Sequence, residues 1–517
     1  MIVLNQQQMQ ELDTNTMSFL KRTSLILMEV AGKVCADKII SIMKLLNNKN
    51  PIIIFCGHGN NGGDGFVIAR WLKQNNINTK IILLGNVSKF SESTKNNYEA
   101  CLALDIEINQ LDSIEQAFDF HINNNVCIDA VFGNGFNGAL PALHSTLFAK
   151  INDESSLTIS IDLPSGLSAD TGSADINAIR ADYTLCIAFY KYGHLINRGK
   201  ELCGKIEIVD ICIPNNLLSE EYSKVKLVNR EDISYPNRFK TSHKGDYGKV
   251  AIFAGSDQFT GAAVLSANAC LNAGAGLIYL FSSSAMRKRY DASLIEVIKV
   301  TIPEKDHLPD SISLEKKLQD MDCILIGPGI GTEEYSLELV KTALKQAKMK
   351  PVILDADALN IISKNRELLE EMKGKNVLLT PHIAEFARLS NHNQADIQEN
   401  QIEYLKEFVT KYHVTVLLKS SVSLCSNNED ISIIANGNDG LSTGGSGDVL
   451  AGIISSFVAQ NMRTNSNLRE VLYHAAVSGS YLLGETADSL NEIYETASIT
   501  PQKIINNIFI KKGDKND

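Results

Sequence analysis

Two glycine-rich segments, far apart in the chain, most constrain how this sequence can fold. They are Gly57–Gly65 and Thr443–Asp448, and neither is a copy of the other. Each follows an apolar run typical of a strand and precedes a stretch typical of a helix. Glycines at such a junction let backbone N–H groups at a helix N-terminus close on an anion. The sequence therefore predicts two sites for anionic groups, which suggests two active sites that share a nucleotide-like substrate.

Length and composition indicate a globular protein of two domains. At 517 residues the chain exceeds what one core usually supports, so we expect domains at residues 1–225 and 226–517. The division falls at the polar stretch Asn215–Lys226. The residues are 44% hydrophobic and 21% charged, as in ordinary soluble proteins. A net charge of −11 argues against a general nucleic-acid binder, because phosphate backbones attract an excess of lysine and arginine.

No segment is typical of a membrane span or of an export signal. No apolar run approaches the ~18–20 residues that cross a bilayer, and Met1–Thr14 is polar and carries Glu11 and Asp13. The ten cysteines include no CxxC pair, which favours buried, reduced thiols over a zinc site. We therefore expect a cytoplasmic protein without a membrane partner. We also expect a homo-oligomer, although no residue pattern specifies the oligomeric state.

The first half alternates short apolar runs with longer amphipathic ones. Continuous apolar runs suit strands buried on both faces of a parallel sheet, and their alternation with helices is typical of an α/β domain. Ligands of such domains gather at the carboxyl ends of the strands, where Gly57–Gly65 would lie. We expect helices at Asp64–Gln74 and Ser91–Leu104. The expected strands are Ile52–Phe55, Lys80–Leu84, Val126–Phe132, Leu157–Leu163, Tyr183–Ala188 and Lys205–Ile211.

The second half has the same rhythm with a different sequence. We expect helices at Asp448–Phe457 and Leu468–Leu483. The expected strands are Val250–Ala254, Gly276–Phe281, Cys323–Ile326, Pro351–Leu354, Val377–Leu379, Val414–Leu418 and Ile431–Ile434.

Each of the last five strands expected in the second half is followed by a group of polar or glycine-rich residues. We interpret these five strands as consecutive. Singly, each group has an ordinary structural explanation, such as a satisfied loop histidine or an aspartate that caps a helix. Jointly, they are typical of an α/β site assembled at one edge of a sheet. The groups are Gly327–Gly331, Asp355 with Asp357, Thr380–His382, Lys419 and the Thr443–Asp448 loop.

The Thr443–Asp448 loop has the most constrained chemistry. Its N–H groups could hold a transferring phosphoryl group, while Asp448 accepts a proton from an attacking hydroxyl. The Walker lysine pattern is absent, which argues against a P-loop enzyme. The structural alternative is that Asp448 only caps the helix after a glycine turn.

Several motifs of the second half resemble the NAD(P)H-hydrate dehydratase family, which has a ribokinase-like α/β fold. They are Ser242–Lys249, Ala254–Ser256, Thr260–Ala263, Leu379–His382 and the loop that ends in Asp448.

The first half resembles the NAD(P)H-hydrate epimerase domain, a Rossmann-like three-layer sandwich, through Gly57–Gly65, Asp129–Gly135 and Ile161–Gly166. The two resemblances cover nearly the whole chain, in the order found in bifunctional NAD(P)H-hydrate repair enzymes. They imply that residues 1–225 are an epimerase domain and residues 226–517 an ADP-dependent (S)-NAD(P)H-hydrate dehydratase domain.

The resemblance implies the repair of a damaged cofactor. Hydrated NADH or NADPH carries a hydroxyl on the nicotinamide ring, as R and S epimers. The first domain would interconvert the epimers, and the second would dehydrate the S form with ADP, giving NAD(P)H, AMP and phosphate. Phosphorylation is chemically sensible because hydroxide leaves poorly and phosphate leaves well.

For the dehydratase, the resemblance implies that Asp448 is the general base and also contacts the hydrate, and that Mg²⁺ accompanies the phosphates. Further hydrate contacts would come from Ala262, Gly329 and His382. The nucleotide would be bound by Lys419, Ser420, Ser421, Val422, Ser423, Asn438, Thr443, Gly444, Gly445, Ser446 and Gly447.

For the epimerase, the resemblance implies acid–base work by Asp162, which would also bind the substrate, with Lys191 as a weaker candidate. Asn61, Asp129 and Ser165 would bind K⁺, which needs only hard oxygen atoms. The substrate's phosphates and ribose would be bound by Asn60, Asn61, Gly62, Gly63, Asp64, Gly133, Asn134, Gly135, Phe136, Asn137, Gly138 and Ala139.

Two departures from the family pattern bear on the dehydratase site. Ser420 stands where a glycine is usual, and Ile383-Ala384 replaces a usual Pro-Gly after His382. Two other functions remain open. The second half could be a vitamin or sugar kinase with the same fold, and the first half could be a nucleotide-sensing or scaffolding module without catalysis.

Overall fold

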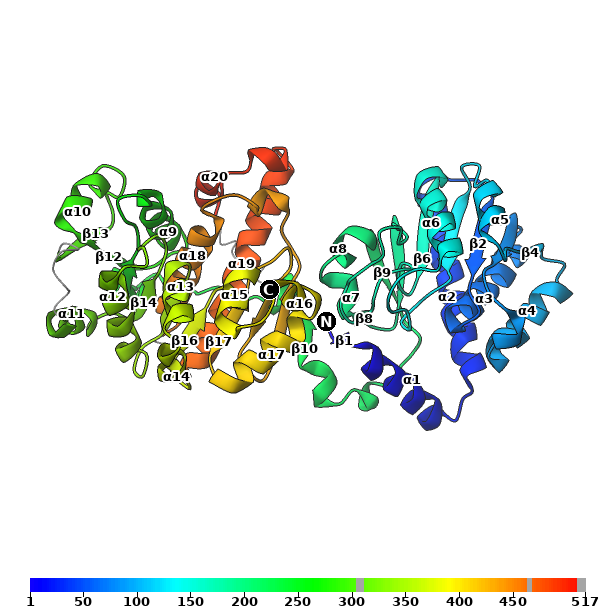
Figure 1. Ribbon diagram of the computed structural model, residues 1–517, viewed down its shortest axis with the longest axis horizontal. Coiled ribbons are helices and arrows are strands. Elements are labelled where there is room, and N and C mark those ends of the chain that lie inside the picture. The colour runs from blue at the N-terminus through cyan, green and yellow to red at the C-terminus, as the bar shows by residue number, and fades with distance from the viewer. Residues whose placement is uncertain (304–310, 463–466, 509–517) are drawn as a thin grey trace. The chain divides into compact units, whose positions relative to one another are not determined.

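The computed structural model describes residues 1–303, 311–462 and 467–508. The chain forms two compact units, one of residues 2–225 and one of Met1 with the described residues from 226 onward. Each unit is an α/β structure built around its own mainly parallel sheet (Figure 1).

The N-terminal unit is built on seven parallel strands in the order β4-β3-β2-β5-β6-β7-β9. The chain runs from β2 outward to β3 and β4, then returns to β5 on the other side of β2 and continues outward to β9. The strand order therefore reverses between β2 and β5, and α/β proteins bind ligands at such a topological switch point. All six strands expected in this half are present, and β4 is an additional edge strand. The strands are β2 (Ile52–Cys56), β3 (Thr79–Leu83), β4 (Ile108–Gln110), β5 (Val126–Ala130), β6 (Leu157–Ile161), β7 (Tyr183–Ile187) and β9 (Lys205–Val209).

Helices cover this sheet, and a two-stranded parallel sheet joins β1 (Val3–Leu4) to β8 (Tyr190–Lys191). Met1–Thr14, which the sequence presents only as a polar segment, contains β1 and most of α1. The helices are α1 (Gln6–Leu20), α2 (Ser24–Leu45), α3 (Asn60–Gln74), α4 (Glu92–Ala103), α5 (Ile114–Asp119), α6 (Ala142–Glu154), α7 (Tyr192–Leu195) and α8 (Gly199–Leu202).

Helix α3 begins four residues earlier than the expected start at Asp64. Glycines in and just before this helix permit close packing. A Cβ on Gly62, in the first turn, would lie 2.0 Å from Gly57 O, and one on Gly57, in the preceding loop, would lie 2.1 Å from Val131 O. These contacts bring the helix N-terminus against the ends of β2 and β5.

The C-terminal unit has a ten-stranded sheet in the order β10-β19-β18-β17-β16-β15-β14-β11-β12-β13. From β13 inward to β17 each strand in this order is parallel to the next, whereas β18 is antiparallel to both β17 and β19. The strands are β10 (Val225–Leu227), β11 (Lys249–Phe253), β12 (Leu277–Ser283), β13 (Ile298–Ile302), β14 (Cys323–Ile326), β15 (Val352–Leu354), β16 (Val377–Leu379), β17 (Thr415–Leu418), β18 (Ser423–Ser426) and β19 (Ile431–Ile434).

The seven expected strands of this half are present, but the expectation that the last five are consecutive is wrong. Strand β18 lies between β17 and β19 and reverses the chain twice. Because of the two reversals, β19 again runs parallel to β17, so the Thr443–Asp448 loop is reached from the expected edge of the sheet.

Helices also cover the second sheet. They are α9 (Thr260–Asn272), α10 (Ser284–Tyr290), α11 (Ser311–Leu318), α12 (Glu334–Gln346), α13 (Asp357–Lys364), α14 (Glu367–Met372), α15 (Ile383–Ser390), α16 (Gln394–Glu399), α17 (Gln401–Tyr412), α18 (Ser446–Asn461), α19 (Leu468–Asn491) and α20 (Pro501–Asn506).

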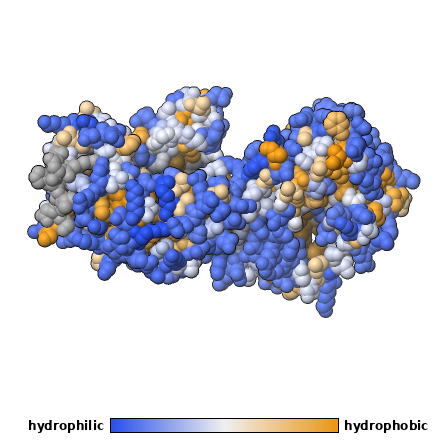
Figure 2. Space-filling model, in the orientation of Figure 1, coloured by the Kyte–Doolittle hydropathy of each residue, from blue (hydrophilic) through white to orange (hydrophobic). Residues whose placement is uncertain are grey.

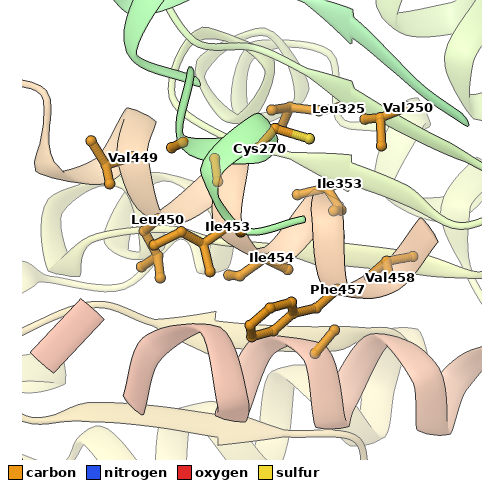
Figure 3. Packing of buried hydrophobic residues seen from close by; sticks show 14 of the residues in the cluster. Val250, Cys270, Leu325, Ile353, Val449, Leu450, Ile453, Ile454, Phe457 and Val458 are labelled. Atoms are coloured by element: carbon orange, nitrogen blue, oxygen red, sulfur yellow. The ribbon is translucent and has the colours of Figure 1, made fainter. Parts of the chain in front are cut away.

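Helix α18 is the centre of the C-terminal core. Every residue from Val449 to Gln460 is buried, because the helix packs against the sheet, α9 and α19 (Figure 3). Gly452 permits the close approach of α9, since a Cβ there would lie 2.3 Å from Ser266 O. A helix that is apolar on all sides is stable only in such an interior. Its N-terminal turn therefore has a fixed position.

The surface of the protein shown in Figure 2 is largely hydrophilic and its cysteines are reduced, as the composition and the cysteine spacing predict. That face has small hydrophobic patches. All ten cysteines are free thiols, and nine are buried; Cys212 is exposed. Among the described residues no helix is both long and apolar enough to cross a bilayer.

Candidate active sites

Three strand ends of the C-terminal unit converge on the carboxylate of Asp355, which follows β15 and is almost fully buried. Its Oδ1 accepts a hydrogen bond of 2.7 Å from Thr380 Oγ1, after β16, and one of 2.8 Å from Lys419 Nζ, after β17. Buried charges are tolerated when they are paired and hydrogen-bonded. The contact therefore fixes the position of the lysine charge.

Asp448 lies in the first turn of α18 and is not its cap. The N-cap is Gly445, whose φ of 100° is a left-handed conformation that favours glycine. The alternative interpretation of Asp448 as a helix cap is therefore wrong. Burial, together with the charge of Asp355, raises the pKa of Asp448 to about 6, although Lys419 opposes the rise. A carboxyl group that titrates near neutrality is suited to accept a proton from a hydroxyl.

The ammonium of Lys419 lies beside the glycine loop, since a Cβ on Gly447 would be 3.4 Å from Lys419 Nζ. Burial lowers the pKa of Lys419, but Asp355 and Glu385 raise it by more, so the group stays charged. In the described ranges the N–H groups of Gly445 and Gly447 have no hydrogen-bond acceptor, as is usual in a first helical turn. The loop thus offers N–H groups and a positive charge to a phosphoryl group.

His382 caps α15 instead of lying free in a loop. Its Nδ1 accepts a hydrogen bond of 3.1 Å from Ala384 N, and its Nε2 lies 3.5 Å from Glu385 Oε1. Burial, Lys419 and Arg388 lower the pKa of His382. The Ile383-Ala384 replacement is therefore compatible with a well-formed helix start. The imidazole of His382 is half-exposed, and the backbone of His382 forms a parallel bridge with that of Lys419.

The remaining residues predicted for this unit lie around the same edge. A Cβ on Gly329 would be 3.1 Å from that of Ala262, so the two predicted hydrate contacts are neighbours. Ser420 does not have a positive φ, so serine in place of glycine introduces no backbone strain. Of the others, Val422 and Ser446 are buried, Ser423 begins β18, Asn438 caps a short 3-10 turn, and Ser421, Thr443 and Gly444 are exposed. A hollow of about 190 Å³ at the ends of β11 and β12 is separate from Asp448.

The N-terminal unit contains a cavity of about 460 Å³ at the switch point between β2 and β5. Of the residues predicted to bind substrate there, seven line it: Asn60, Asn61, Asp64, Gly133, Asn134, Gly135, Phe136, as does the predicted acid–base residue Asp162. Gly62 and Gly63 are buried behind the lining, and Asn137, Gly138 and Ala139 are exposed outside it.

A cluster of oxygen atoms surrounds the buried carboxylate of Asp129, at the end of β5. Asp129 Oδ2 accepts hydrogen bonds of 2.8 Å from Ser160 Oγ and from Ser165 N, and Oδ1 accepts one of 2.5 Å from Ser165 Oγ. Burial raises the pKa of Asp129, and these hydrogen bonds oppose the rise.

Asn61 is linked to Ser165 through Phe132 O, which accepts a hydrogen bond from each of them. Asn61 Nδ2 donates a hydrogen bond of 3.0 Å to Phe132 O, while its Oδ1 is buried and has no hydrogen-bond partner in the described part of the chain. An unpartnered buried oxygen is costly unless a cation or water meets it. The oxygens of Asn61, Asp129 and Ser165 fit a hard monovalent cation, and no described group of His, Cys, Asp and Glu fits a transition metal.

Asp162 follows β6 with a φ of 65° and forms a buried ion pair with Lys191 of β8. Lys191 Nζ also donates a hydrogen bond of 2.9 Å to Ile187 O. His194 Nδ1 accepts from Lys191 N at 2.9 Å, so Nε2 carries the proton and donates to Asp162 O at 2.6 Å. Lys191, treated above as the weaker candidate, is thus the direct partner of Asp162.

The sequence patterns did not predict the helical wall of this cavity. The wall consists of residues of α1 and α2, together with His58 in the loop after β2. The helical lining residues are Met9, Gln10, Asp13, Met17, Ser24, Leu27, Met28 and Ala31. A helix-period pattern in residues 6–45 could have revealed the two helices, but not which of their faces meets the cavity.

Each unit has charged residues gathered at the carboxyl edge of its sheet, and the two sites have unlike chemistry. This arrangement defines a bifunctional α/β enzyme. Comparison with known families agrees: residues 24–193 match the family described as YjeF-related protein N-terminus, and residues 250–509 match the NAD(P)H-hydrate dehydratase family.

Individual relatives match over most of the chain. It is 32% identical to the bifunctional NAD(P)H-hydrate repair enzyme Nnr of Moorella thermoacetica, over 94% of this chain and 92% of that one. The chain belongs to the family of bifunctional NAD(P)H-hydrate repair enzymes.

Solved structures also resemble part of the chain. A ribokinase-like superfamily protein from Enterococcus faecalis has a TM-score of 0.48 and 26% identity, over 55% of this chain and 94% of that one. An ADP/ATP-dependent NAD(P)H-hydrate dehydratase from Bacillus subtilis, co-crystallised with ATP and Mg²⁺, has a TM-score of 0.44 and 24% identity, over 55% of this chain and 95% of that one.

Proposed function

We propose that this chain restores hydrated NADH and NADPH. The N-terminal unit, the epimerase, interconverts the R and S hydrates, and the C-terminal unit, the dehydratase, converts the S hydrate with ADP into NAD(P)H, AMP and phosphate. The observation that carries the proposal is that each of the two family matches of this chain contains its own cluster of charged residues. The membership of the family of bifunctional repair enzymes supports it.

In the dehydratase, Asp448 takes the proton of the hydrate's hydroxyl. The hydroxyl oxygen then bonds to the β-phosphorus of ADP, whose bond to AMP breaks. The Gly445 and Gly447 N–H groups and Lys419 stabilise the charge on the transferring group. Phosphate leaves the ring carbon with its bonding electrons, and loss of a proton from the adjacent carbon restores the double bond.

Metal ions support the two steps in different ways. Mg²⁺ would accompany the ADP phosphates, as is usual for such ligands. In the epimerase, the oxygens of Asn61, Asp129 and Ser165 would hold K⁺, which supplies positive charge near the substrate's phosphates. The buried, unpartnered Asn61 Oδ1 supports this assignment.

In the epimerase, the ionised carboxylate of Asp162 accepts or returns the proton of the substrate. Lys191 holds it in place from one side, and His194 holds its backbone from the other. The Gly133 backbone lies close by, because a Cβ there would be 3.4 Å from Asp162 Oδ2. Substrate seated on Gly133–Phe136 would therefore lie against this oxygen.

The test follows the absorbance of reduced nicotinamide while the purified protein acts on mixed NADH-hydrate epimers with ADP, Mg²⁺ and K⁺. Complete recovery of NADH is expected. Recovery that stops at the S fraction would overturn the epimerase assignment, and Asp162→Asn should reproduce that pattern. Absence of recovery, with ADP or ATP consumed on a vitamin or sugar alcohol, would instead favour a kinase.

A further inference from the structure

One face of helix α1 lines the epimerase cavity. Met9, Asp13 and Met17 are spaced four residues apart and all line it. The position of the helix is fixed at its start, because Leu4 of β1 pairs with Lys191 of β8. The N-terminal segment is thereby tied to the strand that carries the lysine partner of Asp162. Helix α1 lies before residue 24, where the family match begins.

The side chain of Asp13 makes no polar interaction that would stabilise the fold among the described residues. In the described part of the chain its carboxylate forms no hydrogen bond or ion pair, and it is flanked by two methionines along this face of the helix. The charged groups that face the same cavity are Lys191, Asp162 and Asp64. Burial raises the pKa of Asp13 to about 6, with Asp162 adding to the rise and Lys191 opposing it.

The cavity thus holds three carboxyl groups in different surroundings. Asp162 forms an ion pair with the Lys191 ammonium. Burial, Asp162 and Asp13 raise the pKa of Asp64 well above its usual range. Asp13, which titrates near neutrality, can both donate and accept one.

The proposed reaction needs two such groups. Water adds to an enamine with its oxygen on the carbon next to nitrogen, so the hydrate's stereocentre carries both the hydroxyl and the ring nitrogen. Inverting this centre requires a bond to break on one face and to re-form on the other. Departure of the hydroxyl needs an acid, and return of water needs a base.

We propose that Asp13 is the second acid–base residue of the epimerase and acts with Asp162, which lines the same cavity; this inference rests on the proposed function. Protonated Asp13 gives its proton to the hydroxyl, and the C–O bond breaks with its electrons leaving on water. The nitrogen lone pair forms a C=N⁺ bond. Water adds to the opposite face of this bond and loses a proton to Asp162. In the reverse direction the two residues exchange roles, and solvent restores the protons.

The test compares Asp13→Asn with Glu11→Gln in the full chain. Glu11 lies on the same helix but outside the cavity lining, with its carboxylate accepting a hydrogen bond from Gln7. R hydrate and S hydrate are supplied separately with ADP, Mg²⁺ and K⁺, and the spontaneous epimerisation rate is subtracted. For Asp13→Asn we expect kcat on R hydrate to fall by about 100-fold or more, with KM changed less than about threefold. Dehydration of S hydrate should keep its wild-type rate, which shows that the C-terminal unit is intact, and the nearly unchanged KM for R hydrate shows that the N-terminal cavity still binds its substrate.

The pH profile distinguishes a catalytic role from a structural one. If Asp13 must be protonated to donate, the wild-type epimerisation rate of R hydrate has a limb that titrates near pH 6. Asp13→Asn should lose that limb, and Glu11→Gln should keep it. If the wild type epimerises R hydrate and Asp13→Asn does so with a kcat within about threefold of the wild-type value, the assignment of Asp13 is overturned. A variant in which only KM rises would overturn it as well. Failure of the wild type to convert R hydrate would instead overturn the proposed function.

Discussion

Lys419 Nζ and Asp355 Oδ1 lie 2.8 Å apart and join the ends of β17 and β15 across the intervening strand β16. The sequence places these residues 64 positions apart, and neither has another ion-pair partner within the described residues. The pair holds the ammonium of Lys419 beside Gly447. Asp355 raises the pKa of Asp448, and Lys419 lowers it. The dehydratase site therefore depends on an ion pair that is itself part of the sheet edge.

Breaking this pair should damage both stability and catalysis. In Asp355→Asn the buried Lys419 charge loses its partner, which typically costs about 3–5 kcal/mol of unfolding free energy. We expect a lower Tm for the C-terminal unit in calorimetry and at least tenfold slower dehydration of S hydrate. The matched control is Glu338→Gln, which breaks the half-exposed Lys341–Glu338 pair and should change stability by less than about 1 kcal/mol. Equal effects of the two variants would contradict the prediction.

Dehydration should depend on pH through Asp448. The base must be ionised, so kcat/KM for S hydrate should rise with pH and level off above its pKa of about 6. Asp448→Asn should reduce kcat by about 100-fold or more, without this pH dependence. A profile that is flat from pH 5 to 8 in the wild type would exclude Asp448 as the base.

The same carboxyl group should make the folded protein less stable at neutral pH. Its pKa in the folded state is raised above the unfolded value, so stability falls as pH rises from about 4 to 6 and the loss is complete above that window. Asp448→Asn should therefore be more stable than wild type by about 2 kcal/mol at pH 7. Denaturant unfolding at pH 7 and pH 4 checks this, because the difference should disappear at the lower pH.

Gly445 should not tolerate a side chain. Its φ is 100°, and a Cβ there would lie 2.6 Å from Leu265 Cδ1. Gly445→Ala should cost about 1–3 kcal/mol of unfolding free energy and displace the start of α18. Gly444→Ala is the stability control, since nothing lies within 4 Å of a Cβ at that position. Similar unfolding midpoints for the two variants would contradict the predicted strain.

Potassium should bind the N-terminal unit without any turnover. The oxygens around Asn61 and Asp129 predict a higher Tm in KCl than in tetramethylammonium chloride at equal ionic strength, because a ligand of the folded state stabilises it. Ser165→Ala removes an oxygen and leaves Phe132 N–H without its 2.8 Å acceptor. In this variant the salt-specific shift should vanish and R hydrate should no longer be converted, while S hydrate is dehydrated normally. A shift that persists in Ser165→Ala would place the cation elsewhere.

Sequence patterns were sufficient for most strands of both sheets. Runs such as Ile52–Phe55 and Val377–Leu379 are continuous apolar segments, and a strand buried on both faces requires this composition wherever it lies. The glycine loops were equally visible, because close contacts such as that of Gly62 with Gly57 O exclude every side chain. Short or half-exposed strands, β4 and β13 among them, lack that pattern and were missed.

The sequence by itself determined the alternation of strands and helices, the two glycine loops and the family motifs that contain Asp448, Asp129 and Asp162. These features are local, since they depend on residues within one or two turns or strands of each other. Only the tertiary structure decided that β18 separates β17 from β19, that Lys419 pairs with Asp355, and that α1 brings Asp13 to the cavity. Such contacts depend on which segments are buried together, and burial and charge pairing between distant segments leave no periodic signal in the chain.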